Sequence, residues 1–284
     1  MELVSAAKMR KATGNVLASR SYANVAWEII ARLSEKVKKE LNPLLIQRSE
    51  IKNIALVVIS SNRGLCGGFN NQIIQKALQY IKENESKADI IDIITMGQKC
   101  YNGIVKANYT PAADFEKKDI TTSITDIYSL SHLVVNDFIN KKYDKVIIAY
   151  TDYVSALTQK PRIMQLLPLS TEDTDSELGA VGKADEERKA EKLVQEESSD
   201  YVLEPDPKEL LDIIVPKIIE IRLYQAVLES DASEHSARMM AMKNANESAS
   251  DMISELTLIY NQARQAGITK EISEISGGKA ALEE

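Results

Sequence analysis

The segment best suited to chemistry is the glycine-rich stretch SNRGLCGGFN, at residues 61–70. Its glycines, Gly64, Gly67 and Gly68, lie between a predicted strand and a predicted helix, which is where phosphate-binding loops occur. Arg63 would supply a cation for a phosphate. The spacing matches neither GxxxxGKS/T nor GxGxxG, so it favours a structural turn over a phosphate site.

Other reactive side chains are few. Cys66 has no histidine near it in the sequence to activate it as a nucleophile, and with Cys100 it forms no CxxC pair. Two thiols in 284 residues suit a reducing compartment. His132 and His235, the only histidines, are too far apart to suggest a zinc site. The sequence therefore predicts no catalytic residue, no metal and no cofactor, and the chain is not expected to be an enzyme itself.

The middle of the chain alternates buried strands with helices. Short apolar runs rich in β-branched residues predict strands at Ile54–Ser60, Ile90–Met96 and Lys145–Tyr150, each buried on both faces. Helices are predicted over Asn71–Asn84, after Gly97, and over Ile120–Lys141. This order predicts a parallel, doubly wound sheet, a Rossmann-like α/β domain over residues 51–170.

The strand region ends in a segment with a different pattern. Residues 154–169 read as extended and suit an edge hairpin, since Pro161 and Pro168 argue against a central strand. Residues 171–206 then carry 13 acidic against 4 basic side chains, a local charge of −9 in a chain of net charge −7. This composition predicts a mobile acidic insert.

Both ends of the chain carry the 3.5-residue repeat of helices that coil around a partner. The C-terminal seam comprises His235, Met239, Met242, Asn246, Ala249, Ile253, Leu256, Tyr260, Ala263 and Gly267. The N-terminal seam comprises Met9, Ala12, Val16, Ser19, Ala23, Ala26, Ile30, Leu33 and Val37. The alternative is two ordinary amphipathic helices on a globular core. We expect an antiparallel coiled coil of the segments 1–50 and 207–284.

Composition excludes two further classes of protein. The longest apolar run, Ile54–Ile59, is far shorter than the ~18 residues that a membrane span requires. The basic, aromatic-interleaved surface of a nucleic-acid binder is also missing from the sequence. The sequence therefore predicts neither a membrane-spanning segment nor a nucleic-acid-binding surface.

Four segments of the sequence carry longer motifs. They are MELVSAAKMRKA at 1–12, SSNRGLCGGFN at 60–70, YVLEPDPKELLD at 201–212 and SARMMAMKNANESASDMISELTLIYNQARQAGITKEISEI at 236–275. These segments resemble the gamma subunit, the central rotor stalk, of F-type ATP synthases. The last is long and specific, and together they cover the chain in the family's order. Relative to the family pattern, the chain lacks the first twenty or so residues of the N-terminal helix.

The resemblance implies a fold, partners and a mechanism. It implies a coiled coil of the terminal helices with a Rossmann-like domain between them that holds no nucleotide. The coiled coil would stand among three alpha and three beta subunits, and the globular end would meet an epsilon-type subunit and the c-subunit ring. Rotation of that ring by protons would drive ATP synthesis at the beta subunits. The expected location is peripheral, on the cytoplasmic face of a bacterial inner membrane, with membrane association only through the complex. A location on the matrix side of a mitochondrial inner membrane is less favoured.

The resemblance also implies roles for individual residues. Arg264, Gln265 and Thr269 match the family's contact with a catch loop of the beta subunit, and Arg238 and Met1 match positions near the beta lever. Gly64, Gly67 and Gly68 would be structural. The alternatives are a nucleotide-binding α/β enzyme with helical dimerisation arms, which rests on the glycine loop alone, and a generic coiled-coil adaptor.

Overall fold

The computed structural model describes residues 1–36, 42–48, 50–169 and 207–282. The predicted acidic insert, residues 171–206, lies outside the described residues. The chain divides into two compact units, Met1–Met240 and Ala241–Glu284. Helix α6, Pro207–Leu282, contributes to both units.

The first unit is built on a five-stranded sheet with the order β3-β2-β1-β4-β5. Its strands are β1 (Asn53–Ile59), β2 (Ile90–Met96), β3 (Ala113–Phe115), β4 (Lys145–Tyr153) and β5 (Gln159–Leu167). The first four are parallel, and β5 pairs with β4 in the antiparallel direction. The three predicted strands are confirmed, as is the edge hairpin.

Each face of the sheet packs against helices. Alternate residues of β1 point to opposite sides: Leu56 belongs to the core that includes α2 (Phe69–Asn84) and α3 (Gln98–Lys106). Val57 belongs to the core that includes α4 (Tyr128–Ile139) and the first part of α6. This double burial is why the strand reads as an uninterrupted apolar run.

Two predictions about elements need correction. The helix expected over Ile120–Lys141 is shorter: it begins with a 3₁₀ turn, η2 (Ile124–Ile127), and continues as α4. Ser123 and Asp126 form a capping box that starts the helix there, because their side chains satisfy the first free backbone N–H groups. The three-residue strand β3 has no counterpart in the prediction, since so short an edge strand leaves no periodic pattern.

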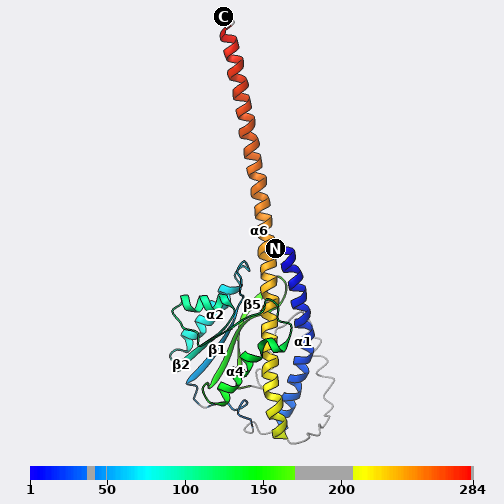
Figure 1. Ribbon diagram of the computed structural model, residues 1–284, viewed down its shortest axis with the longest axis vertical. Coiled ribbons are helices and arrows are strands. Elements are labelled where there is room, and N and C mark those ends of the chain that lie inside the picture. Colours follow the sequence, from blue (N-terminus) through cyan, green and yellow to red (C-terminus); the bar gives the residue numbers. More distant parts are fainter. Residues whose placement is uncertain (37–41, 49, 170–206, 283–284) are drawn as a thin grey trace. The chain divides into compact units, whose positions relative to one another are not determined.

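Helix α1, Glu2–Lys36, packs on α6 within the first unit and runs in the opposite direction (Figure 1). Ala12 and Val16 of α1 are buried with Leu228 and Ala232 of α6. Ser19 Oγ donates a hydrogen bond to Gln225 Oε1 at 2.5 Å. These contacts place three predicted N-terminal seam residues against α6.

Helix α6 begins at Pro207, where the missing N–H costs nothing because the first turn has no intrahelical acceptors for it. It also includes Pro216, and the flanking Val215 and Ile219 are fully buried in the core of the first unit. This burial offsets the hydrogen bond that a proline removes from a helix interior. Among the described helices, none has both the length and the apolar content of a membrane span.

Candidate functional site

The glycine-rich loop joins β1 to α2 and is held by its own side chains. Ser61 Oγ donates to the Arg63 carbonyl at 2.6 Å, and Asn70 Oδ1 accepts from the Ser61 N–H at 3.1 Å. Leu65 and Gly67 have φ values of 61° and 57°, the left-handed region that turns the chain sharply. The loop thus has the character of a rigid turn.

Cys66 in this loop is almost fully buried and accepts a hydrogen bond from Asn70 Nδ2 at 3.1 Å. Burial raises the pKa of the Cys66 thiol above its usual value, although the charge of Arg238 opposes this rise. Burial likewise raises the pKa of Cys100 to about 11. A thiol that stays protonated at neutral pH is a poor nucleophile, so neither cysteine is set up for catalysis.

Arg238 of α6 lies against the glycine loop. Its Nε donates to the Gly64 carbonyl at 3.3 Å and its Nη2 to the Arg63 carbonyl at 3.2 Å. The same Nη2 lies 2.9 Å from Glu234 Oε1. A phosphate cradle presents N–H groups to an anion, whereas this loop presents two carbonyl oxygens to a cation of its own chain.

Helix α6 also reaches the carboxyl end of β4, next to β1 in the sheet. Ser233 Oγ donates to the Thr151 carbonyl at 3.2 Å, and Ser236 Oγ to the Ala156 carbonyl at 2.7 Å. The gap between β1 and β4 is the point where strand order reverses, and ligands of open α/β sheets bind in the crevice outside it. In this chain the backbone carbonyls at that crevice accept hydrogen bonds from side chains of α6.

We therefore expect the isolated chain to show no saturable micromolar binding of ATP, ADP or NAD, because its own helix occupies the contacts a nucleotide would need. Isothermal titration of the isolated chain with each nucleotide measures this. Saturable micromolar binding of any of the three by the isolated chain would contradict the expectation and would favour the nucleotide-binding alternative.

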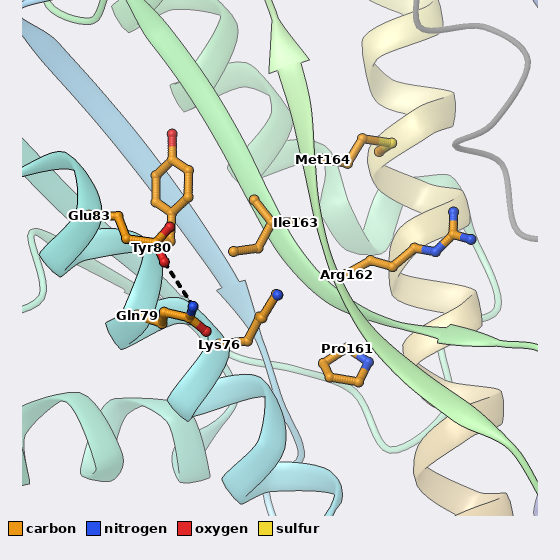
Figure 2. Close-up of a pocket in the computed structure, with 8 residues that line it drawn as sticks. All are labelled: Lys76, Gln79, Tyr80, Glu83, Pro161, Arg162, Ile163 and Met164. Atoms are coloured by element: carbon orange, nitrogen blue, oxygen red, sulfur yellow. Dashed lines mark hydrogen bonds between the residues drawn. The ribbon is translucent and has the colours of Figure 1, made fainter.

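A pocket of about 440 Å³ lies elsewhere, between α2 and the edge strand β5. Figure 2 shows Pro161 and Ile163 on the α2 side of β5, while Arg162 and Met164 point the other way. The Arg162 guanidinium pairs with buried Asp152, Nε to Oδ2 at 3.0 Å, so it is not free to bind an anion. Its α2 side is lined by Lys76, Gln79, Tyr80 and Glu83, and Gln79 Nε2 donates a hydrogen bond to Glu83 Oε1 at 2.8 Å.

A buried ionic network joins α6 to the segment that follows β3. Lys117 Nζ lies 2.5 Å from Asp231 Oδ1 and 2.9 Å from Glu234 Oε2. The side chains of Lys117 and Asp231 are 1% and 0% exposed. Burial disfavours the charged form of Lys117, but the two carboxylates prevail and raise its pKa. For Glu234, Lys117 and Arg238 outweigh burial and lower the pKa, so the buried contact between Lys117 and Glu234 is an ion pair.

Asp119, Glu234 and His235 come close enough together to suggest a metal site. Asp119 pairs with Lys8, Glu234 pairs with Lys117 and Arg238, and His235 Nε2 lies 2.9 Å from the Asp119 carbonyl. His235 must donate from Nε2 there, which leaves Nδ1 to accept from Arg238 Nη1 at 3.3 Å. A metal ion would have to displace these cations, so the cluster does not fit one.

The proposed contact residues fall in different places. Arg264, Gln265 and Thr269 are exposed in the second unit, and Met1 is 79% exposed in the first. The Arg238 side chain is only 12% exposed and bonds within the chain, which the sequence did not indicate. Sequence reasoning missed Lys117 and Asp231. The signal that could have found Asp231 is the dense run of polar residues Glu229–Ser236 within a predicted helix, which the structure buries.

The second unit consists of helix with large apolar side chains exposed to solvent. Those more than half exposed are Met252, Ile253, Leu256, Leu258, Ile259, Tyr260, Ile272 and Ile275. At about 100° per residue, Ile253, Leu258 and Ile259 point in widely different directions around the helix. A helix with apolar residues on several sides is expected to be enclosed by partners.

Comparison with known proteins identifies the family. The family model for ATP synthase matches residues 1–282. The ATP synthase gamma chain of Chloroflexus aurantiacus is 38% identical over 284 residues, covering 99% of this chain and 91% of that protein. Those of Roseiflexus castenholzii and Legionella pneumophila are 37% and 36% identical, covering 100% and 99% of this chain and 92% of each relative.

Solved structures agree on the fold. A chain of the Tetrahymena thermophila mitochondrial ATP synthase central stalk and c-ring structure has a TM-score of 0.61 at 21% identity, covering 87% of this chain and 97% of that one. A chain of the Euglena gracilis mitochondrial ATP synthase has a TM-score of 0.56 at 20% identity, covering 98% and 95%. Given the full-length match to the curated gamma chains, this chain belongs to the ATP synthase family as one of its gamma chains.

Proposed function

We propose that this chain is the non-catalytic central-stalk rotor subunit of an F-type ATP synthase. In this role it couples rotation of a proton-driven c-subunit ring to conformational change, and so to ATP synthesis, at the catalytic sites of the beta subunits. The observation that carries the proposal is the exposed helix of residues 243–276 with its large apolar side chains, in a chain that matches gamma chains over nearly its full length. A rotor acts by making different contacts with each beta subunit, which shifts its population of states.

The proposed partners of the second unit are three alpha and three beta subunits arranged around the helix. Apolar residues on several sides of residues 252–275 support this, because a partner on one side would leave the others in water. We further propose that the first unit meets an epsilon-type subunit and the c-ring. The complex would lie on the cytoplasmic face of a bacterial inner membrane, in keeping with the bacterial relatives.

The proposed architecture has four parts: an N-terminal coiled-coil helix (1–50), a Rossmann-like domain (51–170), an acidic insert (171–206) and a C-terminal coiled-coil helix (207–284). The strand order and the helices on both faces of the sheet support the Rossmann-like designation. Burial of Ala12 and Val16 against α6 supports an antiparallel coiled coil of the terminal helices.

Within this role we propose that Arg264, Gln265 and Thr269 contact a catch loop of the beta subunit, and that Met1 and Arg238 lie near its lever. Exposure of the first three residues and of Met1 supports direct contact. Most donors of Arg238 are used inside the chain, so its contribution to the lever would come largely through the glycine loop that it holds.

Reconstitution tests the proposed function. The chain is mixed with the alpha and beta subunits of a bacterial F-type synthase, and complex formation and ATPase activity are measured. We expect a stable complex whose ATPase activity requires this chain. If no complex forms with the partners of a close bacterial relative such as that of Chloroflexus aurantiacus, the proposal fails.

The catch-loop assignment predicts that replacing both Gln265 and Thr269 with alanine weakens assembly roughly tenfold. Two surface hydrogen bonds contribute about 0.5–1.5 kcal/mol each. Both side chains are exposed, so the melting temperature of the isolated chain should not change. Gln75→Ala with Thr110→Ala, two exposed residues of the same types in the first unit, is the matched control. If the Gln265 and Thr269 double variant binds alpha and beta subunits as tightly as the control double variant, the catch-loop assignment is wrong.

A further inference from the structure

One short stretch of α6 is hydrogen-bonded to the rest of the first unit on every side. We call it the polar collar; its α6 residues are Asp231, Ser233, Glu234, His235, Ser236 and Arg238. All except Arg238 are fully buried. From residue 243 to residue 276 every residue of the helix is exposed, so the collar lies where the buried part of α6 ends.

The collar residues point in all directions from the helix axis. An α-helix turns about 100° per residue, which puts Ser236 about 140° and Ser233 about 200° from Asp231. His235 then lies at about 40°, while Glu234 and Arg238 lie at about 300° and 340°. No sector wider than about 100° is without a hydrogen bond to the surrounding chain.

Three separate segments supply the partners. Residues 117–121 supply the Lys117 ammonium to Asp231 and Glu234, and the Thr121 N–H to Asp231 Oδ2 at 2.7 Å. The end of β4 and the turn after it supply the Thr151 and Ala156 carbonyls, and the glycine loop supplies those of residues 63–64. The collar is thus held by three loops from the carboxyl edge of one sheet.

The same segment 117–121 also holds α1. Asp119 pairs with Lys8, and Asn15 Nδ2 donates to the Thr121 carbonyl at 3.2 Å. Helices α1 and α6 are therefore both bonded to residues 117–121, close to the residues at which α6 changes from buried to exposed.

Apolar packing alone would not fix the rotation of α6 about its own axis. Hydrophobic burial is non-directional, so a helix with apolar residues on several faces retains much of its burial when it turns. Hydrogen bonds and ion pairs depend steeply on distance and angle. Buried ion pairs often add little to stability, and fixing a unique arrangement is their best-attested role.

We infer that the polar collar locks α6 against rotation about its axis relative to the sheet, so that torque applied to the first unit turns the helix without slippage. This inference rests on the proposed rotor function. Lys117, Ser233 and Ser236 are then positioning residues: they touch no substrate and act by holding the helix at one angle.

Two variants test the collar. Lys117→Met removes the ammonium that joins two carboxylates. Lys118→Met is its control, because the Lys118 side chain is 64% exposed and pairs with Asp126, which is not a collar residue. Ser233→Ala with Ser236→Ala removes two hydroxyl donors from the opposite side and leaves no unpaired buried charge. If the Lys117→Met chain does not fold, the double serine variant alone tests whether the collar fixes the rotation of α6.

The first measurement uses the isolated full chain and does not depend on the rotor function. Spin labels are attached at Met240→Cys on α6 and Lys76→Cys on α2; the native cysteines are buried and should not react. We expect the distribution of inter-label distances to become at least twofold wider in both collar variants, with unchanged helix content. A merely structural role would lower the melting temperature without widening the distribution. An unchanged width in both variants overturns the inference.

The second measurement uses the assembled synthase in vesicles. We expect the collar variants to retain ATP hydrolysis within about twofold of the Lys118→Met level, yet to pump several-fold fewer protons per ATP hydrolysed. Equal pumping in all variants overturns the inference. If the unaltered chain itself fails to support pumping, the proposed function fails, and the spin-label measurement alone decides on the collar.

Discussion

A chain that ends at Met240 is expected to fold and yet to support no ATP synthesis. Among the residues whose burial the structure describes, every buried apolar side chain lies in the first unit, and the last of them along the chain is Ala232. Removing residues 241–284 therefore deletes no described buried side chain, and the free energy of unfolding of the first unit should change by less than about 1 kcal/mol. Synthesis should fall to the level of a complex without this chain, because the proposed contacts with beta subunits are gone.

Thermal unfolding and ATP synthesis in reconstituted vesicles measure the two halves of this prediction. A chain that ends at Ser276 is the control: it keeps Arg264, Gln265 and Thr269, and should retain most of the synthesis. Synthesis at the full rate by the chain that ends at Met240 would refute the rotor role of the second unit. If the chain that ends at Met240 does not fold, the first unit does not fold independently of the second, and this half of the prediction is wrong.

The largest effect on stability is expected from Gly97→Ala, at the junction of β2 and α3. Gly97 has φ +107°, and an added Cβ would lie 2.6 Å from the Ser60 carbonyl oxygen, a backbone atom that cannot turn aside. Ser60 is itself fixed, because its N–H donates to the Met96 carbonyl at 2.9 Å and its Oγ accepts from the Cys100 N–H at 2.7 Å. Strain and clash together should cost about 3 kcal/mol or more.

Gly14→Ala is the matched control for that substitution, and it should raise the free energy of unfolding where Gly97→Ala lowers it. Gly14 is exposed within α1, and an added Cβ would have no neighbour within 4 Å. Alanine at an exposed helix position is more favourable than glycine by about 1 kcal/mol. Urea unfolding of both variants gives the free energies. Equal stability of the two would contradict the geometry at Gly97.

Much of the sheet and its helices was predictable from the sequence, because burial leaves a local pattern. The run Ile54–Ile59 predicts a strand covered on both faces, and the structure places α2 and α3 on one face and α4 and α6 on the other. The start of α4 was predicted too early, because the capping pair Ser123 and Asp126 outweighs the apolar periodicity that continues upstream. Strand β3 was not predicted, because three residues are too few to show a period.

The candidate contact residues divide in the same way. The C-terminal segment gave Arg264, Gln265 and Thr269 through the family resemblance, and the structure leaves all three exposed. Arg238 came from the same resemblance, but the structure directs its guanidinium into the chain, toward Glu234 and the glycine loop. An arginine on a helix has the same sequence appearance in either setting.

The sequence by itself determined the buried strands, the two long terminal helices and the family, because each is encoded by periodic burial or by a contiguous motif. Only the tertiary structure decided that Lys117 meets Asp231 and Glu234, and that α6 occupies the crevice beside the glycine loop. The physical reason is that burial repeats along an element at a fixed period, whereas an ion pair depends on the distance between two charges in space. Partners more than a hundred residues apart leave no period to detect.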